Sequence, residues 1–512
     1  MSDIAGYTLA NIDVEIDPDA PRRVWARDSS YWGPGDDDPA SRLGWLESHV
    51  DMAAAESDLV AFAEDAAGRG PVTVVLLGMG GSALAPEVFA RTLEVAAGRR
   101  LVLCDSTHPA EVARVEAALD LSRCLFVVSS KSGTTVETSS LYRLFRSRID
   151  DGSRFVAITD PGTPLHQLAL AEGFLATFTN RPDIGGRYSA LSYFGVVPAA
   201  LLGVDLAPLL RGARKMAELC SAAVPAEENP GAVLGSLLGR LAERGNDKLT
   251  FVISPPFAAF GDWVEQLVAE STGKRGRGIS PVVGEPVVSA ETYGRDRTFV
   301  HIRSGNDDTH NDFVATLAGM GHPVIRIDVD SSGALGAEIF RWEFAVAVAS
   351  AVMGINAFDQ PDVESAKASA RAALESEEQI GWLEEDPETI FDGLAPPELS
   401  ALLLFAPSTD EARVTLEAAR RKLVTRTGVA TSAGFGPRYL HSTGQLHKGG
   451  PVDVRALVVL DTPAEDIPVP GAGYGFARLV TAQAQGDVHA LRAAGRRVAS
   501  TTFQRFNQWA KQ

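Results

Sequence analysis

Short apolar runs alternate with segments of helical periodicity in the first part of the chain. The runs VTVVLLG, LVLCD, CLFVVSS and FVAIT, at residues 72–78, 101–105, 124–130 and 155–159, are typical of buried strands. Between them, residues 84–97, 109–119, 134–148 and 164–172 have the apolar spacing of helices. Strands that alternate with helices predict a parallel sheet with helices on both faces.

The same alternation occurs twice more. Strands are predicted at 249–254, 299–303 and 323–329, with helices near 229–243, 259–272, 309–320, 335–355 and 361–376. An acidic segment with prolines, 377–396, is typical of a linker or a lid. After it, strands at 401–407 and 455–461 accompany helices at 410–424 and 476–496.

This order predicts an α/β protein with several units. A length of 512 residues favours two or three domains. We expect two doubly wound domains with parallel-sheet cores and helices on both faces, followed by a C-terminal α/β unit. The expected boundaries are an N-terminal extension at 1–44, a first domain at 45–220, a second at 221–376, a linker at 377–398 and the C-terminal unit at 399–512.

Composition narrows the class of protein. Hydrophobic residues make up 45% and charged residues 22% of the chain, the usual mix of a globular protein. The net charge of −19 argues against nonspecific nucleic-acid binding, but a local pocket can still be positive and take an anionic substrate. The three cysteines have no CxxC spacing, so neither a zinc site nor a disulfide framework is indicated.

Targeting and membrane segments are not indicated by the sequence. The first twenty residues lack a basic region followed by an apolar core, the pattern of a signal peptide. The longest apolar run, 344–354, is too short to span a bilayer. We therefore expect a soluble cytoplasmic protein with no membrane partner.

A glycine-rich turn, LLGMGGSALAP, follows the first predicted strand. It offers an anion the backbone of Gly78, Gly80, Gly81 and Ser82 and the start of a helix. It also fits the dinucleotide fingerprint G-x-G-x-x-A through Gly78, Gly80 and Ala83, and Asp105 ends the next strand, where a ribose-binding acid would lie. A tight turn without a ligand is the third interpretation, and the turn alone does not choose among them.

A second loop, VVSSKSGTTVET, is more specific for phosphate. It places hydroxyl groups and one cation at the start of a helix, from Ser130, Lys131, Ser132, Thr134 and Thr135. A helix N-cap needs only one hydroxyl, whereas a phosphomonoester is bound by several donors and a cation. The Walker pattern is absent, so a sugar phosphate is favoured over a nucleoside triphosphate.

Together these two loops resemble the SIS-type sugar-isomerase domain. Three further segments resemble the glucose-6-phosphate isomerase family: GGRYSALS with Arg187, EQLVAESTGKRGRG with Gln266 and Glu270, and FDQPDVESAK with Gln360 and Lys367. The resemblance implies that the two doubly wound domains are SIS domains. It also implies an aldose–ketose isomerase of glycolysis and gluconeogenesis that acts on a sugar phosphate without cofactor or metal, and a homodimer whose site is completed across the interface.

The resemblance assigns roles to the charged residues. Glu270 would be the general base, Arg187 would lie beside the reacting carbons and Lys367 at the sugar ring oxygen. The chemistry fits these residue types, because a carboxylate must move a proton between C1 and C2 and a cation must stabilise the enediolate oxygen. For each residue a structural role is the alternative: a solvated surface group for Glu270 and Lys367, and an ion pair for Arg187.

The ring-opening histidine is where the sequence departs from the family. The family carries it between the glutamate and the lysine, but here the similar segment, GPRYLHSTGQLHKGGP, follows Lys367 and contains His441 and His447. This order resembles the isomerase half of transaldolase–isomerase fusions. Either the C-terminal unit delivers His441 or His447 to the site, in this chain or in a dimer partner, or the likeness is chance.

Three other functions stay open at this point. A dual phosphoglucose/phosphomannose isomerase would use the same chemistry with different pocket residues. A non-catalytic SIS-type regulator would bind a sugar phosphate without turning it over, although the Glu270, Arg187 and Lys367 set argues against it. An NAD-dependent oxidoreductase would use the Gly78 turn, but nothing else in the chain favours that function.

Overall fold

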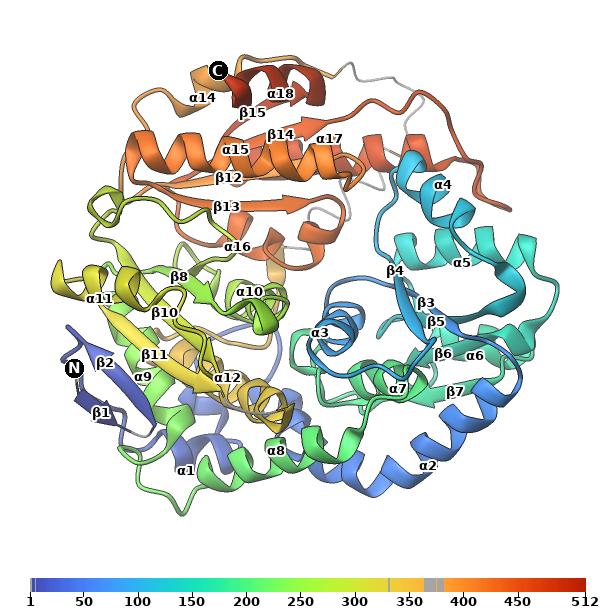
Figure 1. Cartoon of the computed structure of the whole chain (residues 1–512), viewed down its shortest axis with the longest axis horizontal. Coiled ribbons are helices and arrows are strands. Elements are labelled where there is room, and N and C mark those ends of the chain that lie inside the picture. Colours follow the sequence, from blue (N-terminus) through green and yellow to red (C-terminus); the bar gives the residue numbers. More distant parts are fainter. Residues whose placement is uncertain (1, 5, 330–331, 363–373, 375–381) are drawn as a thin grey trace.

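The computed structural model describes residues 2–4, 6–329, 332–362, 374 and 382–512. In this part of the chain, three β-sheets with helices around them form three units (Figure 1). Their strand orders are β4-β3-β5-β6-β7, β1-β2-β11-β10-β8-β9 and β13-β12-β14-β15. The predicted α/β fold class is confirmed, because each sheet has a parallel core.

The first sheet separates two helical layers. On β3, Val74 and Leu76 belong to one hydrophobic cluster, while Val75 and Leu77 belong to another, because successive side chains point to opposite faces. The strands are β3 (Thr73–Gly78), β4 (Arg100–Cys104), β5 (Cys124–Ser129), β6 (Phe155–Thr159) and β7 (Ala176–Thr179). The helices are α2 (Ser48–Gly68), α3 (Leu84–Thr92), α4 (Pro109–Ala117), α5 (Val136–Arg148), α6 (Pro164–Ala171), α7 (Tyr193–Leu201) and α8 (Leu206–Leu219).

The second sheet includes strands from the start of the chain. Strand β2 pairs antiparallel with β11, where Leu9 lies opposite Ile325, so part of the expected N-terminal extension joins this sheet. The elements are β1 (Ser2–Ile4), β2 (Tyr7–Ala10), α1 (Ala20–Trp25), α9 (Pro230–Glu243), β8 (Lys248–Ile253), α10 (Phe260–Thr272), β9 (Ser280–Val282), β10 (Arg297–Ser304), α11 (Asn311–Gly319), β11 (Val324–Val329) and α12 (Ser332–Val352). Most of the helix expected at 361–376 lies outside the described residues.

The third sheet is parallel, with α17 on one face and α15 and α18 on the other. Its elements are α14 (Pro387–Phe391), β12 (Leu399–Phe405), α15 (Asp410–Thr427), β13 (Ala430–Phe435), α16 (Gly444–Gly449), β14 (Val454–Leu460), α17 (Phe476–Ala493), β15 (Arg497–Thr502) and α18 (Phe503–Lys511). Part of the expected linker packs here, since the Trp382 indole donates to the Thr501 carbonyl at 2.9 Å. Our domain boundaries stay a prediction.

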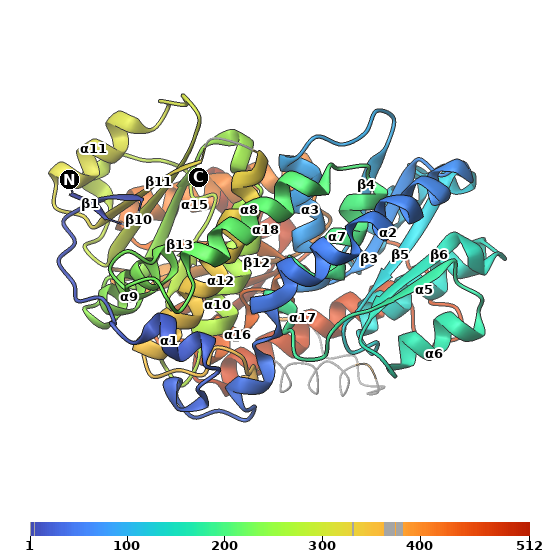
Figure 2. The ribbon, with the colours of Figure 1, turned by 90° about the horizontal axis from the view of Figure 1, so that it is seen from below.

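Helix α17 joins the third unit to the first. Phe476 and Leu479 at its start share a core with Phe145 of α5, while Val480 and Leu491 pack against the third sheet. Figure 2 shows α17 reaching from one sheet to the other. None of the described helices has both the length and the apolar character that crossing a membrane requires.

Candidate active site

Two glycine turns of the first unit touch and fix the position of Arg187. The turn η4 (Gly80–Ser82) follows β3, and η7 (Gly186–Tyr188) precedes α7. A Cβ at Gly81 would overlap the carbonyl oxygen of Gly186, so only glycine permits this approach. Gly81 and Ser82 are buried in this contact and lie beside the arginine loop.

Arg187 is a buried cation fastened to two other segments. Its side chain is 4% exposed, and it donates to the backbone carbonyls of Glu270 at 3.0 Å and Asp359 at 2.8 Å. Its Nη1 also lies 3.4 Å from Oε1 of Glu270. These bonds to backbone atoms hold the guanidinium in place and leave it close to the carboxylate that the sequence marks as the base.

Gln266 lies one helical turn before Glu270 on α10 and links it to the third unit. Its Nε2 donates to Oε2 of Glu270 at 3.0 Å and to the backbone carbonyl of His441 at 2.7 Å. Its Oε1 has no hydrogen-bond partner among the described residues. The structure therefore brings three predicted residues, Arg187, Gln266 and Glu270, together around one carboxylate.

Lys274 and Asp359 extend this network, and our sequence reasoning missed both. Lys274 Nζ lies 2.9 Å from Oδ1 of Asp359 and donates to the Asn356 carbonyl at 2.5 Å. The pKa of Lys274 is lowered to about 7, first by burial and then by Arg187, against the opposing effect of Asp359. Both residues lie in the segments ESTGK and FDQ, which was the only signal available for them.

His441 reaches the site from the third unit of the same chain. It ends the turn η10 (Arg438–His441), and its Nε2 lies 2.9 Å from Oε1 of Glu137. Its side chain is 18% exposed, so the ring is partly open to solvent.

His447 has a different environment. It is fully buried in α16, where its Nε2 lies 3.4 Å from the Ser432 hydroxyl. Burial lowers the pKa of His447 to about 3. His441 is partly exposed and His447 is not, so His441 is the better candidate of the two.

Glu137, the partner of His441, is a third residue that our sequence reasoning missed. It lies in the first turn of α5, 4% exposed, and also accepts a hydrogen bond of 2.7 Å from Gln483 of α17. An acid in the first turn of a helix is common because it complements the helix dipole, so its sequence position carries no special signal.

The hydroxyl-rich loop before α5 is partly open to solvent. The Ser130 and Thr135 hydroxyls lie 3.0 Å apart, and those of Ser132 and Thr134 lie 2.9 Å apart. Ser132 is exposed, whereas Ser130 is buried. The Lys131 ammonium is bound by Asp160 and donates to the Pro182 carbonyl at 3.1 Å, so its charge already has partners in the protein.

Two of the predicted residues are not brought to this cluster by the described part of the structure. Gln360 is exposed, next to the buried Asp359. Lys367 lies outside the described residues, so its role stays a prediction.

The dinucleotide interpretation of the Gly78 turn depends on Asp105, whose contacts the structure shows. Asp105, which a dinucleotide site would place on a ribose, receives a hydrogen bond of 2.7 Å from Arg438. The described residues contain no group of three or more His, Cys, Asp or Glu side chains that could hold a metal ion.

Comparison with known proteins identifies relatives of this chain. The family model described as phosphoglucose isomerase matches residues 63–285. A glucose-6-phosphate isomerase from Synechococcus elongatus is 32% identical over 354 residues, which cover 60% of this chain and 67% of the relative. A probable glucose-6-phosphate isomerase from Natronomonas pharaonis is 31% identical over 363 residues, covering 62% and 83%.

Solved structures share the fold. A hypothetical protein from Thermus thermophilus matches with a TM-score of 0.62 and 26% identity, covering 70% of this chain and 94% of that chain. A glucose-6-phosphate isomerase from Chlamydia trachomatis matches with a TM-score of 0.54 and 21% identity, covering 69% and 77%. The Synechococcus and Natronomonas proteins are each more than 30% identical to this chain and are matched over two thirds or more of their length. This chain therefore belongs to the phosphoglucose isomerase family.

Proposed function

We propose that this chain interconverts D-glucose 6-phosphate and D-fructose 6-phosphate by ring opening and proton transfer through a cis-enediol. One observation carries the proposal: the buried Glu270 carboxylate is held between Arg187 at 3.4 Å and Gln266 at 3.0 Å, next to the loop that bears His441. Membership of the family and the names of the relatives support the same reaction.

Glu270 takes the proton from C2 of the aldose and returns it to C1. The Gln266 amide fixes one carboxylate oxygen, so the other is presented in one orientation. Negative charge develops on the enediolate oxygen during this transfer, and the fixed Arg187 guanidinium stabilises it without having to reorganise. Lys274 and Asp359 hold the far side of the same network in place.

His441 opens the sugar ring as an acid and base. Glu137 accepts a hydrogen bond from its Nε2, which leaves Nδ1 to exchange a proton with the substrate. Lys367 is the second proposed group at the ring oxygen. We place His441 in the site of its own chain, because Glu137 and Gln266 of that chain hold it.

The hydroxyl loop holds the phosphate away from the reacting carbons. Ser130, Ser132, Thr134 and Thr135 lie at the start of α5, where hydroxyls and free backbone N–H groups bind an anion. Their hydroxyls bond to one another in the structure and can exchange those bonds for phosphate oxygens. Gly81, Ser82, Lys131, Gln266 and Gln360 are the further proposed substrate contacts. We expect a homodimer located in the cytoplasm.

A coupled assay tests this function. The purified, EDTA-treated chain receives fructose 6-phosphate, and glucose 6-phosphate is followed through an NADP-linked dehydrogenase. We expect turnover that is retained in EDTA and lost in Glu270→Gln, while Glu291→Gln, an exposed matched control, behaves as the wild type. Mannose 6-phosphate is assayed in parallel, and its turnover would show the dual enzyme instead. Tight binding of sugar phosphate without turnover would overturn the enzymatic function and favour a regulator.

A further inference from the structure

One arginine of the third unit binds acidic groups of both other units. The Arg438 guanidinium donates to Asp105 at 2.7 Å, to Glu87 at 2.6 Å and to Asp262 at 3.3 Å. Asp105 directly follows β4 and Glu87 lies on α3, both in the first unit, whereas Asp262 lies on α10 of the second. Arg438 is therefore a point at which all three units are joined through one side chain.

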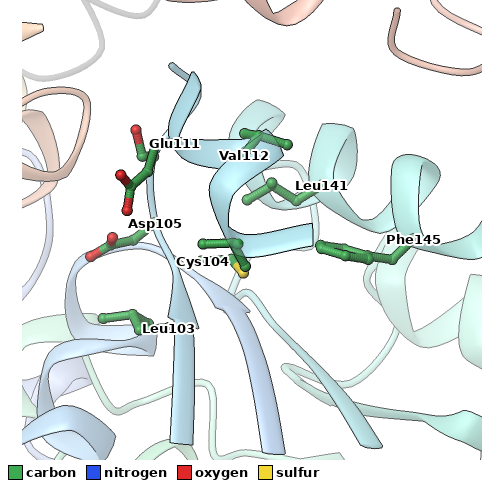
Figure 3. Close-up of a pocket in the computed structure, with 9 residues that line it drawn as sticks. Leu103, Cys104, Asp105, Glu111, Val112, Leu141 and Phe145 are labelled. Atoms are coloured by element: carbon green, nitrogen blue, oxygen red, sulfur yellow. The ribbon is translucent and has the colours of Figure 1, made fainter. Parts of the chain in front are cut away.

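The pKa values of the acids around Arg438 depend on the charge of its guanidinium. Figure 3 shows the Asp105 and Glu111 carboxylates on the side of β4 opposite to Leu141 and Phe145. Burial raises the pKa of Asp105 and of Asp262, and Arg438 opposes this in both. Without the guanidinium, Asp105 would lose the hydrogen bond that Arg438 donates, and Glu87 would keep, among the described residues, only its contact with Arg91 at 3.4 Å.

Arg438 is only three residues from His441 in the same short turn. A four-residue 3₁₀ turn has no stability of its own, so the contacts of its side chains set its orientation. Arg438 fastens its start, and the Tyr439 hydroxyl donates to Asp487 of α17 at 2.7 Å. At its end, His441 is held by Glu137 through its ring and by Gln266 through its carbonyl.

We propose that Arg438 is a positioning residue: its bonds to Asp105, Glu87 and Asp262 hold the turn that presents His441 to the substrate. The guanidinium acts through His441 and does not touch the reacting atoms. The inference rests on the proposed function and deepens it. It also gives Asp105 a role that the glycine-turn motif left open.

Kinetics of Arg438→Lys in two backgrounds test the proposal. A lysine keeps the charge but cannot form the same fork of hydrogen bonds. In the wild type we expect kcat to fall about tenfold with KM within about twofold, since Arg438 acts on ring opening and not on the phosphate loop. In a His441→Asn background the same change should lower kcat less than about twofold, because the residue it positions is gone.

Equal losses in the two backgrounds, or an unchanged kcat, would overturn the proposal. Arg426→Lys is the matched control, because Arg426 forms an exposed ion pair with Glu388 at 2.6 Å within the third unit. If Arg438→Lys does not fold, Asp105→Asn removes the negative charge of one partner with little change of shape. It should give a smaller loss with the same dependence on His441.

A structural measurement separates this proposal from the proposed function. The ¹⁵N chemical shifts of the His441 ring, assigned by comparison with His441→Asn, should change in Arg438→Lys and stay constant in Arg426→Lys. If the wild type turns over no sugar phosphate but these shifts change, the positioning role stands and the isomerase function fails. Turnover with unchanged shifts would remove the positioning role alone.

Discussion

The two sides of the site differ in how their polar groups are satisfied. On the charged side, Arg187 is buried and bonds to backbone carbonyls from two other segments. On the hydroxyl side, the Ser132 and Thr134 hydroxyls bond to each other and lie nearer to solvent. The first side is fixed before a substrate arrives, whereas the second can exchange its bonds for those to a ligand. We therefore expect the charged side to govern the chemical step and the hydroxyl side to govern binding.

The largest effect should follow from Glu270→Gln. The amide keeps the shape of the side chain but cannot take a proton, so kcat should fall about 10³-fold or more while KM changes little. Steady-state kinetics with fructose 6-phosphate measure both constants. A variant that keeps a tenth of wild-type kcat would remove Glu270 from the role of base.

The two histidines should separate catalysis from stability. His441→Asn should lower kcat about 10²-fold because an acid and base is lost. His447→Asn should lower the melting temperature but leave kcat per folded molecule unchanged, since His447 is fully buried. Calorimetry and kinetics on both variants make the comparison, and the reverse pattern would exchange their roles.

Mixing Glu270→Gln with His441→Asn tests whether His441 acts in its own chain. In a site completed across a dimer, random exchange of subunits would restore about a quarter of wild-type activity. We expect no restoration, because each chain supplies its own His441 and Glu270.

Changes on the hydroxyl side should act on KM. In Ser130→Ala and Thr135→Ala, the loss of one hydrogen bond to a charged phosphate should raise KM about tenfold and leave kcat within about threefold. Ser153→Ala is the control, because Ser153 precedes β6 at the opposite end of the parallel strands. A fall in kcat with constant KM would mean that the two sides are not separate in function.

The smallest effect on turnover is expected at Glu265 on α10, where the change concerns stability and its dependence on pH. Burial and Asp262 raise the pKa of Glu265 to about 8, so the folded protein keeps a proton that the unfolded chain loses above its ordinary pKa. The unfolded state then binds fewer protons, and stability falls as the pH rises from about 5 to about 8. Glu265→Gln should remove this loss, which the size of the pKa shift puts at several kcal/mol, on the order of 3 kcal/mol between pH 5 and pH 8. Urea unfolding of the variant and the wild type at these two pH values measures it. Parallel pH profiles for the variant and the wild type would contradict the assignment.

Sequence patterns revealed the fold where strands are apolar and failed where they are not. Strands β3, β5, β8 and β14 coincide within a residue or two with predicted runs. By contrast, β13 has the sequence ATSAGF and β15 the sequence RVASTT. Both consist largely of small and polar residues, so neither has the apolar run from which a strand is predicted. They are strands because β13 pairs with β12 and β15 pairs with β14 in the sheet.

The candidate site shows the same difference between features that a local sequence pattern reveals and features that only the fold creates. The cluster of Arg187, Gln266 and Glu270 could be expected from the sequence because their motifs are local, and the structure brings the three together. Glu137 and Arg438 were missed because their roles come from partners far away in the chain, such as His441, which lies 304 positions after Glu137. Local spacing cannot predict such pairs, whereas the packing of the third unit on the first creates them.

The hairpin of β1 and β2 has a consequence for how the protein behaves at high concentration. It covers the edge of β11, whose run VIRIDV would otherwise present unpaired backbone groups to solvent. The strand left at the edge, β1, has only three residues. Short edge strands discourage the pairing of strands between molecules. The hairpin is therefore expected to reduce aggregation in addition to completing the sheet.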